Sequence, residues 1–410
     1  MATVGLIGTL DTKGAEYAWL LDELASHGCD TVMIDVGTFS RDATHADVTP
    51  AEVAAAGGAS LDALQAADDR GRAMAVMGTG SAAIVAALHA EGRIDALLAI
   101  GGSGGSSIAA EAMRALPVGV PKVLVSTMAS GDVSPYVGES DVTLMYSVVD
   151  ISGINRISRR VLGNAVAAAA GMARRHEGIR DSPDEADGKP LIGMTMFGLT
   201  TPAADEARAR LDELGYEVVV FHATGSGGKA MEGLVAGGFL AGVLDLTTTE
   251  LADELVGGVL TAGPHRLEAA ATSGTPQVVS VGALDMVNFG PKASVPARFS
   301  ERVFLVHNPT ITLMRTTRAE MAELGGIMAA KLAKATGPTE VFLPLKGLSG
   351  IDVEGGPFAD PDADEALFAA IRSGLDGTAV AVHDVPAAVN DEGFGRRMAE
   401  ALDRLIRTRP

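Results

Sequence analysis

The sequence predicts an α/β protein with two similar Rossmann-like lobes, each a mostly parallel sheet covered by helices, and a cleft between the lobes. Short apolar runs alternate with helical patterns along most of the 410 residues, which is typical of parallel sheets. The polar, aperiodic segment Ala173–Pro190 contains two prolines and has the composition of a linker. We therefore expect an N-terminal lobe over residues 1–175, a linker over 176–190 and a C-terminal lobe over 191–410.

The two halves open on the same plan. "VGLIGTLDTKGAEYAWLLDELASHGCDTVMID" and "LIGMTMFGLTTPAADEARARLDELGYEVVVFH" each give an apolar run, a Gly/Thr turn, a helix with Leu-Asp-Glu-Leu, a glycine and another apolar run. Further along, Thr79–Ser81 aligns with Thr224–Ser226, and a late helix pairs Arg156 with Arg315. The ordered matches favour a duplicated architecture. Residues 339–384 then predict two more strands around a helix, and a last helix closes the chain.

The composition limits the kind of protein and its partners. Hydrophobic residues make up 47% of the chain and charged residues 20%, as in a globular protein. The formal charge is −20, and no basic run offers the positive surface that nucleic acids need, so we expect no nucleic-acid partner.

Other features concern the compartment. Cys29 is the single cysteine, which rules out an intrachain disulfide and suits a reducing environment. The opening "MATVGLIGTLDTKG" is typical of a first strand rather than a signal peptide. No apolar stretch approaches the roughly 20 uninterrupted residues of a membrane span. We expect a cytoplasmic protein with no membrane partner.

Four glycine-rich turns of the first half follow predicted strands. They are "GTLDTKG" (Gly8–Gly14), "DVGT" (Asp35–Thr38), "GTGS" (Gly78–Ser81) and "GGSGGSS" (Gly101–Ser107). The carboxyl ends of parallel strands meet at one edge, where glycines admit a ligand to the backbone and helix N-termini attract anions. None of the turns is a Walker A loop or a full Rossmann fingerprint. Together they predict a nucleotide or anion site, whereas each alone is more often a plain connection.

Individual side chains carry open alternatives. Lys13 can meet a phosphate. Asp35 suits either a ribose hydroxyl or the capping of its own turn. Asp150 is a candidate helix N-cap, and Arg156, with two more arginines nearby, either clamps an anion or lies on a solvated face. The residues that we expect to contact the nucleotide are Gly8, Thr9, Thr12, Lys13, Asp35, Gly78, Thr79, Gly80, Ser81, Gly101, Gly102, Ser103, Gly104, Gly105, Ser106, Asp150 and Arg156.

The second half carries the candidate acid/base groups. His222 ends a predicted strand, Glu250 lies in "DLTTTELADEL" and His307 in "FLVHNPT", and these three are our candidate catalytic residues. No tight spacing such as His-Glu-x-x-His indicates a metal, so metal ligands stay unassigned. A second Gly-Ser-Gly-Gly, Gly225–Gly228, again separates an apolar run from a helical pattern.

Several phrases in order carry a family resemblance over nearly the whole chain. "GTLDTKG", "SVVDISGINRISRR", "FHATGSGGKAMEGL", "DLTTTELADEL", "VSVGALDMVNFG" and "VHNPTITLMRTT" resemble the Tm-one-like ATP-binding domain family, which is related to a plant tobamovirus-resistance protein. The resemblance implies two α/β lobes, ATP and Mg²⁺ as cofactors, and a homodimer or higher homo-oligomer. The chain departs from the family near its end, where Ala388 and Val389 precede Asn390-Asp391 and the expected histidine is absent.

We therefore expect a cytoplasmic ATP-binding protein, a metabolic enzyme in which an unidentified small-molecule substrate meets the nucleotide in the cleft between the lobes. Two alternatives stay open. One is a nucleotide-independent hydrolase or lyase of a small organic acid, and the other is a noncatalytic metabolite-binding protein. The sequence does not decide whether the protein is an enzyme.

Overall fold

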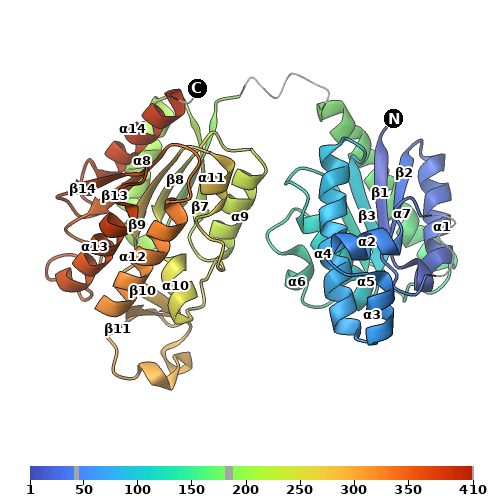
Figure 1. Ribbon diagram of the computed structural model, residues 1–410, viewed down its shortest axis with the longest axis horizontal. Coiled ribbons are helices and arrows are strands. Elements are labelled where there is room, and N and C mark those ends of the chain that lie inside the picture. The colour runs from blue at the N-terminus through green and yellow to red at the C-terminus, as the bar shows by residue number, and fades with distance from the viewer. Residues whose placement is uncertain (41–45, 181–187, 409–410) are drawn as a thin grey trace. The chain divides into compact units, whose positions relative to one another are not determined.

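The computed structural model describes residues 1–40, 46–180 and 188–408, and the chain divides into two compact units, Met1–Asp187 (unit 1) and Gly188–Pro410 (unit 2). Each unit is an α/β domain with a mostly parallel sheet covered by helices (Figure 1). The predicted fold class is confirmed. Helix α7 continues to Arg180, inside the stretch predicted as linker, and Asp181–Asp187 lie outside the described residues.

Unit 1 is built on a five-stranded sheet in the order β2-β1-β3-β4-β5, and every pair in it is parallel. The strands are β1 (Thr3–Gly8), β2 (Asp30–Asp35), β3 (Ala96–Gly101), β4 (Lys122–Ser126) and β5 (Thr143–Tyr146). The central strands β3 and β4 are buried along their whole length, which explains their continuous apolar sequences.

Helices cover both faces of this sheet. One apolar core joins the sheet to α1 and α7, and another joins it to α2–α5 (Figure 1). The helices are α1 (Leu10–Ser26), α2 (Pro50–Ala56), α3 (Leu61–Ala67), α4 (Arg70–Ala90), α5 (Ser103–Arg114), α6 (Ser134–Val137) and α7 (Arg156–Arg180). The strand order changes direction between β1 and β3, which is the switch point at which ligands bind in open parallel sheets.

The turn predicted at Gly78–Ser81 is wrong, because these four residues lie inside α4. The glycines serve packing between helices. A Cβ at Gly80 would lie 1.9 Å from the carbonyl oxygen of Val53 on α2, and one at Gly78 would lie 2.1 Å from Glu111 on α5. The rest of α4 is rich in good helix formers, so two glycines do not end it. Two closely spaced glycines that allow neighbouring helices to pack against α4 therefore look like a turn in the sequence.

Helix α4 is also long and apolar enough to pass a length-and-composition test for a membrane span. Its apolar residues pack in the core with α2 and α5, and Asp69 caps its N-terminus by accepting a hydrogen bond from the Arg72 amide at 3.0 Å. Packing inside unit 1 therefore accounts for the apolar side chains of α4 that lie in this core.

Unit 2 repeats the plan with a six-stranded sheet in the order β14-β13-β9-β8-β6-β7, again with parallel pairs. Its first four strands in the chain take the same relative places as β1 to β4 of unit 1, so the predicted duplication holds at the level of topology. The strands are β6 (Leu191–Met196), β7 (Glu217–His222), β8 (Gly242–Thr247), β9 (Gln277–Gly282), β13 (Thr339–Pro344) and β14 (Ala381–Val385).

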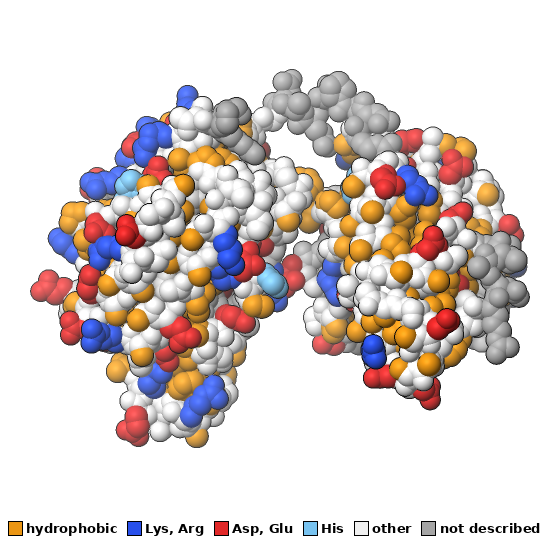
Figure 2. Space-filling view, in the orientation of Figure 1, with side chains coloured by type: hydrophobic (Ala, Val, Ile, Leu, Met, Phe, Trp, Pro, Cys, Tyr) orange, Lys and Arg blue, Asp and Glu red, His pale blue; other side chains and the backbone are white. Residues whose placement is uncertain are grey.

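A small antiparallel sheet, β10-β12-β11, is inserted after β9. Its strands are β10 (Met286–Phe289), β11 (Phe304–Asn308) and β12 (Ile311–Arg315). The helices of unit 2 are α8 (Thr201–Glu213), α9 (Ser226–Ala236), α10 (Glu250–Val256), α11 (Ala269–Ser273), α12 (Arg318–Leu332), α13 (Pro361–Leu375) and α14 (Phe394–Arg407). In the face shown by Figure 2, acidic side chains are spread over both units with basic ones between them.

Candidate functional site

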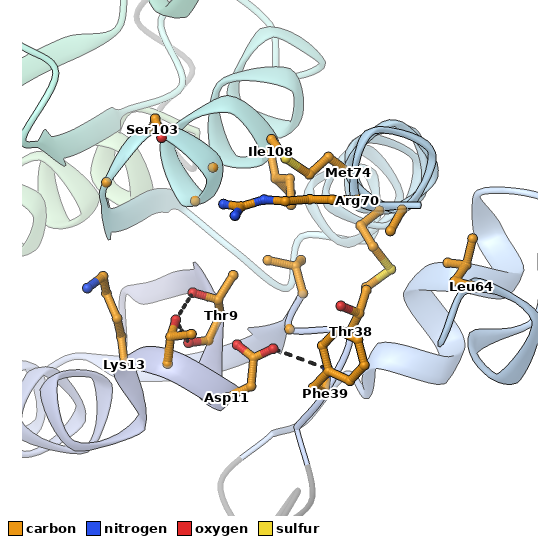
Figure 3. A pocket seen from close by; sticks show the side chains of 18 of the residues that line it. Thr9, Asp11, Lys13, Thr38, Phe39, Leu64, Arg70, Met74, Ser103 and Ile108 are labelled. Atoms are coloured by element: carbon orange, nitrogen blue, oxygen red, sulfur yellow. Dashed lines mark hydrogen bonds between the residues drawn. The ribbon is translucent and has the colours of Figure 1, made fainter. Parts of the chain in front are cut away.

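A pocket of about 560 Å³ lies at the switch point of unit 1, where the carboxyl ends of β1, β2 and β3 meet (Figure 3). Its wall is formed by the start of α1, the Val36–Phe39 turn after β2, the start of α4 and the start of α5. Three of the four glycine-rich turns that the sequence singled out therefore meet at one edge of the sheet. The volume is that of a pocket for a small molecule.

The start of α5 supplies unpaired backbone donors. Gly102 is the N-cap residue and has no side chain to accept the free amides of the first turn. The amides of Ser103, Gly104 and Gly105 have no acceptor among the described residues, and all three residues line the pocket. An unsatisfied helix N-terminus carries positive partial charge and favours an anion.

Two cationic side chains, Lys13 and Arg70, line the same pocket. The Arg70 guanidinium extends toward the start of α5 (Figure 3), and a Cβ built on Gly104 would lie 3.4 Å from its Nη2 atom. Lys13 donates a hydrogen bond to the carbonyl oxygen of Ile151 at 2.5 Å. Within the described part of the chain, neither cation has a carboxylate at ion-pair distance. The two cations therefore share the pocket with Asp11, Asp68 and Asp69, but in the described chain neither is held in an ion pair.

The other end of the pocket is apolar. Phe39, from the turn after β2, is 60% exposed, and it shares this end with Leu64 of α3, Met74 and Met77 of α4, and Ile108 of α5. An exposed aromatic ring beside flexible methionines gives a surface on which a planar ring can stack.

Two aspartates differ in their availability to a ligand. Asp35 is fully buried, and its Oδ1 atom accepts from the amides of Leu10 (3.1 Å) and Gly37 (2.8 Å), so it fastens the ends of β1 and β2 together. Burial raises the pKa of its carboxyl group. Asp11 lines the pocket instead, and its Oδ2 atom accepts from the Phe39 amide at 3.1 Å. The acid at this edge that faces the pocket is therefore Asp11, which the sequence analysis missed.

Other predicted contacts lie under the pocket floor. Gly8 is packed against Tyr17, since a Cβ there would lie 2.0 Å from the ring, and Gly101 ends the buried strand β3. Ser106 is buried and shares a 2.7 Å hydrogen bond with Ser126. Thr9 and Thr12 do line the pocket, and their hydroxyl groups are hydrogen-bonded at 2.8 Å (Figure 3).

The remaining predicted contacts are outside the pocket wall. Gly78, Thr79, Gly80 and Ser81 are internal to α4. Asp150 is exposed and does not cap α7, because Asn155 accepts the hydrogen bonds of the Ile157 and Ser158 amides. Arg156, the first residue of α7, is exposed. Arg70 and Phe39 were missed as well, and the only signal for Arg70 was its place after a capping aspartate.

In unit 2 the second Gly-Ser-Gly-Gly is occupied from within the protein. Glu250, the first residue of α10, is fully buried, and its Oε1 atom accepts from the amides of Gly225 (2.7 Å) and Gly228 (3.0 Å) at the start of α9. Its Oε2 atom accepts from Arg266 at 2.7 Å. Burial raises the pKa of Glu250 and the adjacent guanidinium opposes that effect. The carboxylate occupies the place that an anion would take on α9.

Arg266 completes this buried charge cluster. It binds Asp245 of β8 through both terminal nitrogens, at 2.6 and 2.7 Å, and has no exposed side-chain surface. His222 is exposed and stacks on Phe197 with ring centroids 5.5 Å apart, while His307 is exposed on β11 in the antiparallel sheet. Among the described residues, no hydrogen bond or ion pair joins Glu250 to either histidine. The predicted catalytic residues therefore do not form one contacting group.

Comparison with known proteins identifies relatives of both units. The model described as the N-terminal domain of the uncharacterised protein family UPF0261 matches residues 2–178, and the C-terminal domain model matches residues 189–406. A UPF0261 protein of Clostridium tetani is 50% identical over 401 residues, covering 98% of both chains. The ToMV resistance protein Tm-1(GCR237) of Solanum lycopersicum is 44% identical over 337 residues, 82% of this chain and 45% of the tomato protein.

A likeness to solved structures adds nothing about function. A UDP-N-acetylglucosamine 2-epimerase from Rickettsia bellii covers 98% of this chain and 94% of its own, at 9% identity and a TM-score of 0.23. At that score the likeness supports no inference.

Proposed function

This chain belongs to the UPF0261 family, and from that premise we propose that unit 1 binds a nucleotide, ATP with Mg²⁺, in the pocket at its switch point. One observation carries the proposal. The open N-terminus of α5 lines a pocket together with two cations that are not ion-paired in the described chain, and the same pocket has an apolar, aromatic part. That arrangement suits a ligand with a polyanionic part and a flat, apolar part.

The phosphates fit the polar end. The free amides of Ser103–Gly105 and the side chains of Lys13 and Arg70 are the donors that phosphate oxygens need. A Cβ at Gly104 would point into the space beside Arg70, so glycine keeps the backbone accessible.

The base fits the apolar end. Phe39 offers an exposed ring for stacking, and Met74 and Met77 can adapt to the shape of a purine. Asp68 and Asp69 also line the pocket and can accept hydrogen bonds from an amino group or a ribose hydroxyl.

Magnesium fits through the nucleotide rather than through a protein cage. The described residues contain no group of three or more His, Cys, Asp or Glu that could hold a metal ion. Mg²⁺ typically takes one or two carboxylates together with substrate phosphates, and Asp11 is the carboxylate at the start of α1 that lines the pocket. When bound, the magnesium ion would neutralise part of the negative charge of the phosphates.

The proposal is confined to binding. Both carboxylate oxygens of Glu250 accept hydrogen bonds within the protein, from two amides and from the buried Arg266. These contacts give Glu250 a structural role and do not support a catalytic one. A catalytic role for His222 and His307 has no supporting contact among the described residues.

Calorimetric titration of the full chain with ATP–Mg²⁺ tests the proposal. We expect wild type to bind and Gly104→Val to bind at least about tenfold more weakly, since the side chain enters the space between the α5 amides and Arg70. The matched control is Gly171→Val, because Gly171 is exposed on α7 and a Cβ there meets nothing within 4 Å. Equal affinity of wild type and Gly104→Val would contradict the assignment of the phosphates to this loop.

A further inference from the structure

The segment Ser147–Asn155, which joins β5 to α7 and which we call the strap, is fastened to the start of α1 at two points. The Ile151 carbonyl oxygen accepts from Lys13, and the Gly153 amide donates to Glu16 Oε1 at 2.6 Å. The Ile151 side chain is buried in the core shared by α1, α7 and the sheet. A side chain of the pocket wall is therefore also one of the fastenings of the strap.

The backbone departs from regular geometry on both sides of this contact. Val148 in the strap has φ +66°, a left-handed conformation that is costly for a β-branched residue. Lys13 has φ −133° and ψ 26°, which interrupts the helical geometry of α1. The strain at Val148 is of a kind that persists where surrounding contacts hold it in place, and such strain is common at ligand sites and switch regions.

The hydrogen-bond partner of the Lys13 ammonium group carries no charge. The ammonium group is bonded to a neutral carbonyl, and in the described chain it has no carboxylate at ion-pair distance. The ammonium already makes this hydrogen bond charge-assisted, but a phosphate oxygen adds a full negative charge that a carbonyl oxygen lacks. A phosphate oxygen within reach therefore competes with the Ile151 carbonyl for Lys13.

The position of Lys13 along the pocket decides which phosphate can reach it. In Figure 3, Lys13 and Leu64 lie on opposite sides of the pocket, with the guanidinium of Arg70 between them. If the base lies at the Leu64 side, as the proposed function has it, the first phosphate lies on the side of Arg70 and the phosphates that follow extend toward Lys13.

We propose that Lys13 distinguishes nucleotides by the number of their phosphates. When a triphosphate binds, Lys13 exchanges its hydrogen bond to the Ile151 carbonyl for one to the terminal phosphate, and the strap is released. This inference rests on the proposed function, because it needs a nucleotide bound in this orientation. It assigns to the site a preference for triphosphates and a change in the segment that leads into α7.

Affinities for AMP, ADP and ATP test the first part. In Lys13→Met we expect ATP affinity to fall about 10- to 100-fold, as for the loss of a charge-assisted hydrogen bond, and AMP affinity to change less than about threefold. Arg70→Met should weaken all three nucleotides, and Arg72→Met, an exposed arginine of the same helix outside the pocket wall, should weaken none. An equal loss for AMP and ATP in Lys13→Met overturns the inference.

Hydrogen exchange of strap peptides tests the second part. We expect ATP to increase exchange in residues 147–155 of wild type, and AMP to leave it unchanged. Lys13→Met should show the faster exchange without nucleotide and no further change with ATP. Unchanged strap exchange in wild type saturated with ATP overturns the release of the strap. Lys13→Arg, which keeps the charge, should retain the triphosphate preference, and fluorescence of Trp19 in α1 shows whether each variant is folded.

The two proposals fail in different ways. If wild type binds none of the three nucleotides, the proposed function fails and this inference fails with it. If wild type binds them and Lys13→Met keeps the wild-type ratio of ATP to AMP affinity, only the role of Lys13 is wrong.

Discussion

The same four residues, Gly-Ser-Gly-Gly, begin a helix in each unit, and the two copies have different surroundings. In both, the first glycine is the N-cap residue and the serine is the first helical residue. At α5 the amides of the first turn line a pocket and have no acceptor among the described residues. At the start of α9 the carboxylate of Glu250 accepts hydrogen bonds from two amides, those of Gly225 and Gly228.

The difference teaches that a glycine-rich helix start is a site for negative charge, and that more distant residues decide the source of that charge. Glu250 is 22 to 25 residues away from the amides that it accepts, and Arg266 is 16 residues beyond Glu250. In unit 1 the pocket at the loop is lined by Lys13 and Arg70 as well as by aspartates, but no carboxylate among the described residues accepts from the α5 amides, which leaves them for an external anion. Two changes test this contrast and a third tests a second buried charge cluster of unit 2, from the largest expected effect to the smallest.

Arg266→Met should destabilise unit 2 strongly. The substitution keeps the volume but leaves Asp245 and Glu250 buried without their cation, a loss of about 3–5 kcal/mol in the free energy of unfolding. Calorimetric and denaturant unfolding of the full chain measure it. Trp19 is the single tryptophan and lies in unit 1, so its fluorescence transition should stay where it is in wild type.

The matched control for this change is Arg302→Met. Arg302 pairs with Glu320 at 2.6 Å in the same unit, but both side chains keep about a fifth of their surface exposed (18% and 20%). Solvent screens this pair, and we expect a loss of only about 1 kcal/mol. Similar losses in the two variants would show that burial of the Arg266 cluster is not what matters.

Glu250→Ala should make the α9 loop resemble the α5 loop. Two buried amides lose their acceptor while Arg266 keeps Asp245, so we expect a loss of about 1–3 kcal/mol. Inorganic phosphate should then restore part of the stability of unit 2, because it binds the folded variant at the vacated amides. The unfolding temperature of unit 2 in calorimetry measures the recovery.

Chloride at matched ionic strength separates binding from screening in this experiment. We expect no comparable recovery with chloride, and no comparable effect of phosphate on unit 2 of wild type. A Glu250→Ala protein whose unit 2 responds equally to both salts would break the parallel between the two loops.

Asp364→Asn should make unit 2 less sensitive to pH. One guanidinium, Arg315, lies among Asp285, Asp352 and Asp364, so one cation faces three buried carboxyl groups. Burial, followed by the charge of Asp352, raises the pKa of Asp364 from its usual 3.8 to about 7. The protonated form is thus favoured in the folded state, and the stability that it contributes is complete only below about pH 3.8 and is lost progressively as the pH rises from there to about 7.

In Asp364→Asn this loss is removed while an oxygen remains for Arg315. We expect the stability of the variant relative to wild type to rise by at least about 1 kcal/mol between pH 5 and pH 8.5. Urea unfolding at the two pH values measures the difference. Burial also raises the pKa of Asp253 to about 7, but Asp253 is present in both proteins, so the comparison isolates Asp364. A difference that is independent of pH would contradict the assignment.

The fold could be predicted from sequence because its signals are local. A buried parallel strand such as β3 is a short continuous apolar run, and a glycine-rich turn follows it. The failure at Gly78–Ser81 has a physical cause. The sequence alone does not show whether a glycine serves close contact between helices or a turn. At Gly80 the packing of α2 against α4 shows that it serves helix contact.

The site could be predicted only in part, because side chains from distant segments complete it. The α5 loop and Lys13 were identifiable from glycine spacing and from a position after a strand. Arg70 and Phe39 have no local signature, since their role depends on how α4 and the turn after β2 fold back on the sheet. Glu250 had the residue type of a catalytic acid, but its partner Arg266 could be found only in three dimensions.

The glycines of α4 have one more consequence, for the shape of the pocket. Because α4 contacts α2 through backbone at Gly80, rotation of side chains cannot change the spacing of these helices. The depth at which α4 lies is thereby determined by the main chain, and with it the place from which Met74 and Met77 project. The spacing of the helices around the pocket is thus fixed by backbone contacts, whereas the flexible thioether side chains of Met74 and Met77 can change conformation. Ligands of different shape can therefore be accommodated without movement of α4.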